Sequence, residues 1–288
     1  MLMLLHPAAQ LSGGVSIHPS TVIGSLALGA LYEWRARQAT RSAADGAHSG
    51  SPTTAQRAMF WGALAVLLST LNGPLHDLSD EYLFSAHMLQ HLVLELVIPP
   101  LLIAGTPGWM LRPLIRPRAV RALAERALRP ASCFAIFNVV LAVWHLPALY
   151  NLALAYHPVH IVQHLMFIAA SVVMWWPLLS PMPELPRLSY PGQMLYCFLM
   201  TLPMSVVAVY ITMAERGLYP LYAIAPRVAG ISPLEDQRYG GLIMWIPGGL
   251  FFYLVMSVVF WLWARRGGAD DAEAAQAPVR VPGGVRAA

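Results

Sequence analysis

Seven apolar segments fill most of this sequence, and each is long enough to cross a bilayer as a helix, which takes about 20 residues. Hydrophobic residues make up 57% of the chain and charged residues 11%, against roughly 25% charged residues in ordinary soluble domains. We therefore expect an all-α membrane protein, a seven-transmembrane helix bundle forming a single domain over residues 1–266. The expected spans are about 15–34, 58–74, 83–104, 131–151, 157–179, 193–213 and 240–264.

The distribution of arginine predicts the orientation. The loop 35–57 carries four arginines and the loop 105–130 carries six, and such loops stay in the cytoplasm. The N-terminus is then outside and the C-terminus is cytoplasmic, in a multi-pass protein of the bacterial inner membrane. Residues 41–56 and 267–288 are small and polar, so we expect a flexible linker and a disordered cytoplasmic tail. The arginines are spread over short loops, and nucleic acid is not an expected partner.

Histidines are the main functional signal, because an ionisable group in hydrocarbon is costly unless it is paired or ligating. His87 and His91 are four residues apart, which places them on one face of a helix. Glu95 continues that face one turn deeper, as a further ligand, a partner of His91 or a proton carrier. His145 lies near the outer end of the fourth span, just before Pro147. His145 is therefore expected at the same depth as the histidines of the third and fifth spans.

The fifth span begins with His157, His160 and His164. At 100° per residue, the three side chains occupy an arc of about 60° on one helix. His76 precedes the third span on the same outer side. The pattern predicts that several helices converge on one metal site in the outer leaflet.

Imidazole alone does not select between copper, zinc and iron, whereas thioether ligands favour Cu(I). Met88, Met166, Met204 and Met244 are candidate thioethers, although each is also suited to filling gaps in a core. Copper, as Cu(I) or Cu(II), is the expected ion. Haem held by two histidines is the alternative cofactor. The remaining hypothesis is that the histidines bind no cofactor and serve packing or proton relay.

A polar pair, Asp236 and Gln237, joins the last outer loop to the seventh span, and two glycines follow at 240–241. The glycines permit close helix approach, and Asp236 is a candidate for orienting a ligand.

Four blocks of sequence resemble a known family. SAHMLQHLVLELVIPPLLIAGTPGW at 85–109, WHLPALYNLAL at 144–154, HIVQHLMFIAASVVMWWPLL at 160–179 and DQRYGGLIMWIPGG at 236–249 are similar, in this order, to the CtaG-type cytochrome c oxidase assembly factors of the seven-span kind. The resemblance implies a role in assembling haem–copper oxidases through copper supply. It also selects the five expected site residues: His87, His91, His145, His160 and His164.

These observations predict an assembly factor that binds copper at an outer polyhistidine site and aids its delivery to cytochrome c oxidase. The expected partners are oxidase subunits, the lipid bilayer and an extracytoplasmic copper chaperone. We expect no enzymatic activity, because intramembrane carboxylates for acid–base chemistry are scarce. The alternatives are a copper transporter, a haem-binding electron carrier and a metal-free scaffold for oxidase subunits. His76, Glu95, His157, Met204, Asp236 and Met244 are possible additional ligands or supporting groups.

Overall fold

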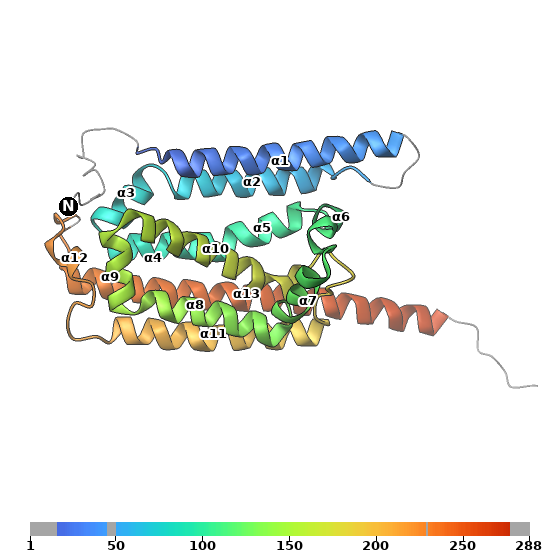
Figure 1. Ribbon diagram of the computed structural model, residues 1–288. Helices are drawn as coiled ribbons and strands as arrows, with labels where there is room; N and C mark the ends of the chain where they lie inside the picture. Colours follow the sequence, from blue (N-terminus) through green and yellow to red (C-terminus); the bar gives the residue numbers. More distant parts are fainter. Residues whose placement is uncertain (1–15, 45–49, 229, 277–288) are drawn as a thin grey trace, which may run out of the picture.

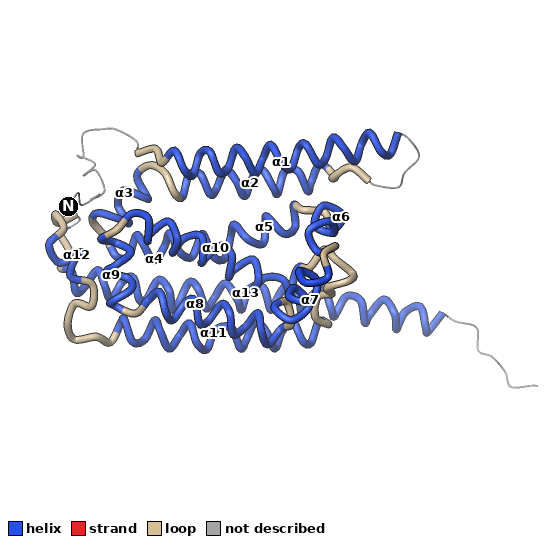
Figure 2. The backbone as a smooth tube through the Cα atoms, in the orientation of Figure 1, coloured by secondary structure: helices blue, strands red, loops and turns tan. Residues whose placement is uncertain are grey.

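The computed structural model describes residues 16–44, 50–228 and 230–276, and the described residues form helices joined by turns and loops (Figures 1 and 2). The helices are α1 (Pro19–Ala44), α2 (Thr54–Thr70), α3 (Pro74–Glu81), α4 (Phe84–Leu92), the π-helical turn η1 (Val93–Val97), α5 (Ile98–Gly105), α6 (Gly108–Leu111), the 3-10 turn η2 (Arg112–Ile115), α7 (Arg118–Ala127), α8 (Pro130–His145), α9 (Pro147–Ala155), α10 (His157–Leu179), α11 (Tyr190–Thr212), α12 (Pro220–Ile224) and α13 (Pro233–Gln276).

Four described helices are long and apolar enough to cross a membrane, which makes the chain a multi-pass membrane protein. They are Phe84–Gly105 (α4, η1 and α5 in one run), His157–Leu179, Tyr190–Thr212 and Pro233–Gly267. Two bent pairs pass the same test when each is taken as one span: α2 with α3, bent by 48°, and α7 with α8, bent by 78°. The structure thus supports four to six spans, and the seventh span and the orientation of the termini stay predictions.

The first expected span, 15–34, differs most from the structure. The helix α1 continues through Glu33, Arg35 and Arg37 to Ala44, so its apolar part is short and α1 is not among the candidate spans. It lies along α2 (Figure 1), with Trp61 of α2 donating to the Glu33 carboxylate at 3.2 Å. Residues 41–44 and 54–56 of the expected linker are helical, in α1 and α2, and residues 45–49 lie outside the described part.

Two further expected spans are interrupted at specific residues. The helix α2 ends at Thr70, and Gly73, with φ of 75°, turns the chain before Pro74 starts α3. A positive φ of this kind suits glycine. The span expected over 131–151 is α8 followed by a separate helix α9, because Pro147 starts a new helix after His145.

The last helix is longer than predicted. The tail was expected to be disordered from residue 267, but α13 continues to Gln276. Alanine and glutamate in this stretch have high helix propensity, which accounts for the extension. Residues 277–288 of the expected tail lie outside the described part.

The main core lies among α4, α8, α10, α11 and α13, with Phe84, Phe137 and Phe167 fully buried. The helix α13 packs closely on two neighbours at adjacent glycines. A side chain at Gly240 would meet the ring of Phe84, and one at Gly241 would meet Thr212 of α11. Figure 1 shows which segments share an end of the bundle. One end holds the N-terminal halves of α4 and α10 and the C-terminal end of α8, and the other holds α6 and α7.

Candidate metal centre

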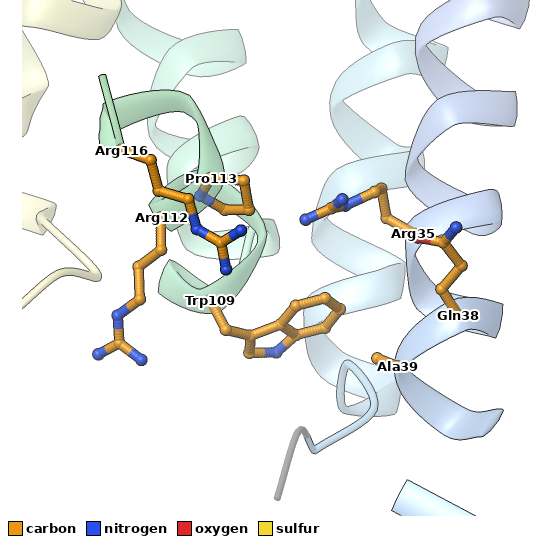
Figure 3. A pocket seen from close by; sticks show the side chains of 7 residues that line it. All are labelled: Arg35, Gln38, Ala39, Trp109, Arg112, Pro113 and Arg116. Atoms are coloured by element: carbon orange, nitrogen blue, oxygen red, sulfur yellow. The ribbon is translucent and has the colours of Figure 1, made fainter. Parts of the chain in front are cut away.

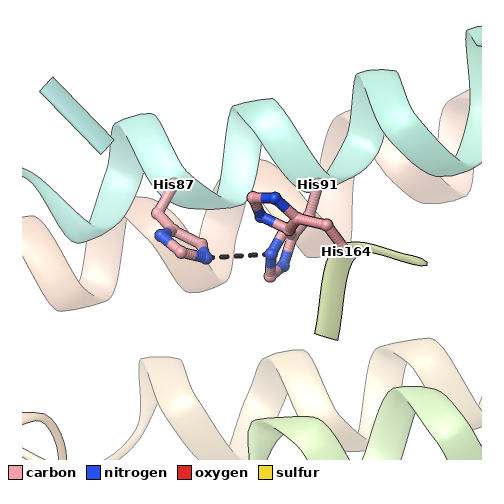
Figure 4. A group of neighbouring side chains, drawn as sticks. All are labelled: His87, His91 and His164. Carbon is pink, nitrogen blue, oxygen red and sulfur yellow. Dashed lines mark hydrogen bonds between the residues drawn. The ribbon is translucent and has the colours of Figure 1, made fainter. Parts of the chain in front are cut away.

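Three histidines from two helices meet inside the bundle. His87 and His91 lie one turn apart on α4, and their Nε2 atoms are 2.8 Å apart. His164 of α10 faces them, with its ring centroid 5.6 Å from that of His91, as Figure 4 shows. The three residues are buried, and each offers one nitrogen that lies within 4.8 Å of the others. The spacing on α4 and α10 therefore brings histidines of two helices together, and their binding of a metal ion stays a prediction.

A second pair repeats this arrangement on α10. The Nε2 atoms of His160 and His164 are 3.0 Å apart, and His160 Nδ1 lies 3.3 Å from a carboxylate oxygen of Asp80. Asp80, His87 and His160 form a second group whose ligand atoms are all within 4.8 Å. The two groups share His87, so they form one contiguous cluster, which we call the histidine cluster.

Asp80 is the candidate site residue that sequence analysis missed. Its carboxylate lies 3.5 Å from His76 Nε2 and 3.9 Å from His87 Nδ1, as well as beside His160. Its side chain is only 4% exposed. The chain bends by 48° between α2 and α3, and the Asp80 carboxylate lies against three imidazoles. The available signal was its position four residues after His76, on the same helical face.

The Nδ1 partners orient two of the histidines for binding an ion. His87 Nδ1 lies 3.3 Å from the Ser79 carbonyl, and His160 Nδ1 faces Asp80. If these Nδ1 atoms carry the ring protons, the Nε2 atoms have free lone pairs that point into the cluster. A metal-ligating histidine commonly donates its other ring N–H to a carbonyl or carboxylate in this way. In each pair the second histidine then donates its Nε2 proton to the first.

The spacing of the nitrogens fits a shared ion. Two imidazole nitrogens that bind one ion at about 2.0–2.1 Å lie about 2.9–3.4 Å apart. The His160–His164 pair, at 3.0 Å, is within this range, and the His87–His91 pair, at 2.8 Å, is just below it. His91 Nδ1 is buried with no hydrogen-bond partner. That orphaned atom is available for the proton when His91 Nε2 becomes a ligand. The residues present therefore fit a metal ion.

A tyrosine from the outer loop closes the cluster. Tyr222 of α12 donates a hydrogen bond to the Ser79 carbonyl at 2.7 Å, and its hydroxyl lies 3.2 Å from His87 Nδ1. Burial raises the pKa of the Tyr222 hydroxyl well above its usual value of 10.0, so the group remains a hydrogen-bond donor. The hydroxyl of Tyr150, on α9, lies 3.3 Å from the Tyr222 hydroxyl.

His145 and Glu95 lie beside the histidine cluster and outside both three-residue groups. The His145 ring is 5.9 Å from that of His91, and its Nδ1 lies 2.7 Å from the Leu141 carbonyl, while its Nε2 is buried without a partner. Glu95 is 2% exposed, and its Oε1 also has no hydrogen-bond partner. Both are therefore buried groups with an unused polar atom near the candidate ligands.

Three other residues that were expected to support the metal site, Asp236, Met204 and Met244, lie outside the histidine cluster. Both carboxylate oxygens of Asp236 bind the N-terminus of α4, accepting from the backbone N–H of Phe84 at 2.6 Å and of Ser85 at 3.2 Å. The Met204 thioether lies against Gly248 in the main core, and Met244 belongs to the same core. Among the other candidate thioethers, Met88 is buried and Met166 is 39% exposed on α10.

His157 lies at the outer edge of the cluster, next to a residue that sequence analysis left unassigned. The ring of His18 is 5.7 Å from that of His157 and 4.3 Å from that of His76. These three histidines, with His160 and His164, line a cavity of about 30 Å³. This is room for about one water molecule, so the cluster has a small polar opening at this end.

Fold and centre together define a class: a multi-pass helical membrane protein with imidazoles gathered around one buried carboxylate. The sequence profile of the family described as "Cytochrome c oxidase caa3 assembly factor" matches residues 30–266. The chain belongs to this family, as the four sequence blocks predicted.

Two curated relatives are similar over part of their length. The uncharacterized proteins Mb0105 of Mycobacterium bovis and MT0111 of Mycobacterium tuberculosis are each 24% identical to this chain over 200 residues. The alignment covers 64% of this chain and 30% of each relative, so the chain matches less than a third of their length. No solved structure matches significantly.

Proposed function

We propose that the chain binds copper at the histidine cluster and passes it to cytochrome c oxidase during assembly. The observation that carries the proposal is the pair of Nε2 contacts, His87 with His91 and His160 with His164, set around the Asp80 carboxylate. Membership of the assembly-factor family supplies the destination. Copper is then cargo, and we propose no catalytic step.

Asp80 suits this role because of its charge. A cation enclosed among neutral imidazoles in a low-dielectric interior needs a compensating anion, and Asp80 lies against His76, His87 and His160. We propose His87, His91, His160 and His164 as the ligands. His76 and Asp80 orient them. His145, whose buried Nε2 has no hydrogen-bond partner, is a further candidate ligand.

The small opening favours an ion over haem. The cavity lined by His18, His76, His157, His160 and His164 holds about 30 Å³, which leaves room for an ion or a water molecule and not for a macrocycle. The opening lies at the end predicted to face the exterior, where an extracytoplasmic chaperone and the oxidase copper centres would exchange the ion in the bacterial inner membrane.

The proposal is tested in a bacterium that lacks its own copy of this gene. Wild-type protein is expected to restore haem–copper oxidase activity and the copper content of the purified oxidase. His87→Ala/His91→Ala is expected to reach the membrane in equal amount and to restore neither. His157→Ala, at the edge of the cluster, is the matched control and should restore both.

Each alternative gives a different result in the same experiment. Full restoration by the His87→Ala/His91→Ala variant would contradict copper delivery and leave a metal-free scaffold. A Soret band in the purified wild type would indicate a haem-binding electron carrier. Copper accumulation in the cytoplasm that depends on the cluster would indicate a transporter.

A further inference from the structure

At the opposite end of the bundle, three arginines surround a cavity of about 380 Å³. Arg35 comes from α1, and Arg112 and Arg116 come from the segment after α6, with Trp109 on the same wall. In Figure 3 the Arg35 and Arg116 side chains extend from opposite walls into the space between α1 and η2. We call this space the arginine cavity. Among the described residues no carboxylate lines it.

Two glutamates at this end already have partners. Glu184 accepts from Arg112 Nε at 2.7 Å, and Glu33 lies 3.7 Å from Arg57. In the described part of the chain, no ion pair joins Arg35 or Arg116 to a carboxylate. Like charges in one cavity repel each other. An anion is therefore the complementary ligand.

A second, apolar cavity of about 310 Å³ adjoins the first and shares Arg35 and Pro113 with it. Leu31 and Leu114, which are 53% and 65% exposed, stand on its walls. Its floor is held rigidly, because the Tyr32 ring stacks on Phe60 at 3.9 Å and the Tyr32 hydroxyl donates to the Gly105 carbonyl at 3.0 Å. A ligand that fills both cavities needs an anionic head and an apolar chain.

We propose that the two cavities form one site for an anionic phospholipid, with the phosphate in the arginine cavity and an acyl chain in the apolar cavity. Guanidinium groups bind phosphate through paired N–H donors, and basic pockets between membrane helices at the cytoplasmic side suit anionic head groups. The arginine-rich end is the one predicted to be cytoplasmic. Such a lipid would also fill the space between α1 and η2, and its contacts with both would stabilise the packing of α1 on the bundle. This inference is independent of the proposed copper function.

The first test uses the wild-type protein in detergent and two lipids with identical acyl chains, phosphatidylglycerol and phosphatidylcholine. Native mass spectrometry is expected to show retention of phosphatidylglycerol at least about tenfold above phosphatidylcholine, because basic residues favour a head group with a net negative charge over a zwitterionic one. Equal retention of the two lipids would overturn the proposal. Complete displacement of phosphatidylglycerol by millimolar inorganic phosphate would also overturn it, since it would show a phosphate site without a chain site.

The second test locates the site. Arg35→Gln/Arg116→Gln is expected to abolish the preference, so that phosphatidylglycerol is retained no better than phosphatidylcholine. Arg126→Gln/Arg129→Gln removes the same charge at the same end from residues that line neither cavity, and should keep the preference. Equal loss in both variants would show general attraction by the basic surface, which contradicts a built site. If the first variant does not fold, the comparison of lipids on the wild type still decides the proposal.

Discussion

The indole Nε1 of Trp175 donates a hydrogen bond of 2.9 Å to the backbone carbonyl of Glu95. That carbonyl would accept from residue 99 in an α-helix, or from residue 100 in the π-helical turn Val93–Val97. Both positions are proline, which has no N–H. The helix α10 thus supplies the donor that α5 lacks. The π-helical turn lies just before the two prolines, within the span Phe84–Gly105.

Replacing Trp175 by phenylalanine should therefore lower the free energy of unfolding by about 1–3 kcal/mol, because the Glu95 carbonyl is left buried without a partner. Thermal unfolding in detergent measures the change. Trp144→Phe is the matched control, since Trp144 is also buried but its Nε1 has no hydrogen-bond partner. Equal destabilisation by both substitutions would mean that the hydrogen bond to Glu95 is not the cause.

Asp236→Ala should destabilise the protein by about 1–2 kcal/mol through loss of the helix cap. Its carboxylate binds the backbone N–H groups of Phe84 and Ser85 at the start of α4. The bound ion should stay near its wild-type amount, because the carboxylate is occupied by the helix end. An unfolding scan and a metal assay on the same sample separate the two effects. Loss of the ion at unchanged stability would make Asp236 a ligand after all.

Asp80→Asn should weaken ion binding by about 10–100-fold, the range typical of groups that orient metal ligands. The substitution keeps the shape of the side chain but removes the charge that faces His76, His87 and His160. Competition with a chelator of known affinity measures the loss. Asp77→Asn, on the same helix, is expected to bind like the wild type. An Asp80→Asn protein of wild-type affinity would exclude the charge role.

Glu95→Leu should weaken ion binding by about tenfold, whereas Glu95→Gln should have little effect. Binding of an ion at His91 Nε2 moves the proton of this ring to Nδ1, which then needs an acceptor. The Glu95 Oε1 atom, one turn along the helix, is buried without a partner, and a glutamine oxygen can take the same position. Comparable affinities for all three proteins in the chelator assay would show that Glu95 does not support His91.

Much of the cluster could be predicted from sequence, because helical spacing fixes which side chains share a face. The i, i+4 pairs His87/His91 and His160/His164 meet as their spacing predicts. Asp80 could not be assigned in this way, since its position depends on the bend at Gly73 between α2 and α3. Its contacts with His76, His87 and His160 are made by tertiary structure, which helical spacing alone does not give.

Helix ends were harder to predict than helix faces. The span 157–179 coincides with α10, because Pro158 near its start and the loop after Leu179 limit it on both sides. The helices α1 and α13 extend beyond their apolar parts into polar sequence. Hydropathy detects the apolar segment and not the helix, so it could not predict these extensions. The role of Asp236 was likewise hidden, since it depends on contact between residues 151 and 152 positions apart.

The central claim is that one ion binds among His87, His91, His160 and His164, and metal content measures it most directly. Protein purified from copper-supplemented membranes should contain close to one copper per chain by mass spectrometry. His87→Ala/His91→Ala should lose most of that copper, and the His157→Ala control should keep it. A folded wild-type protein without copper, or a double variant that retains it, would contradict the account.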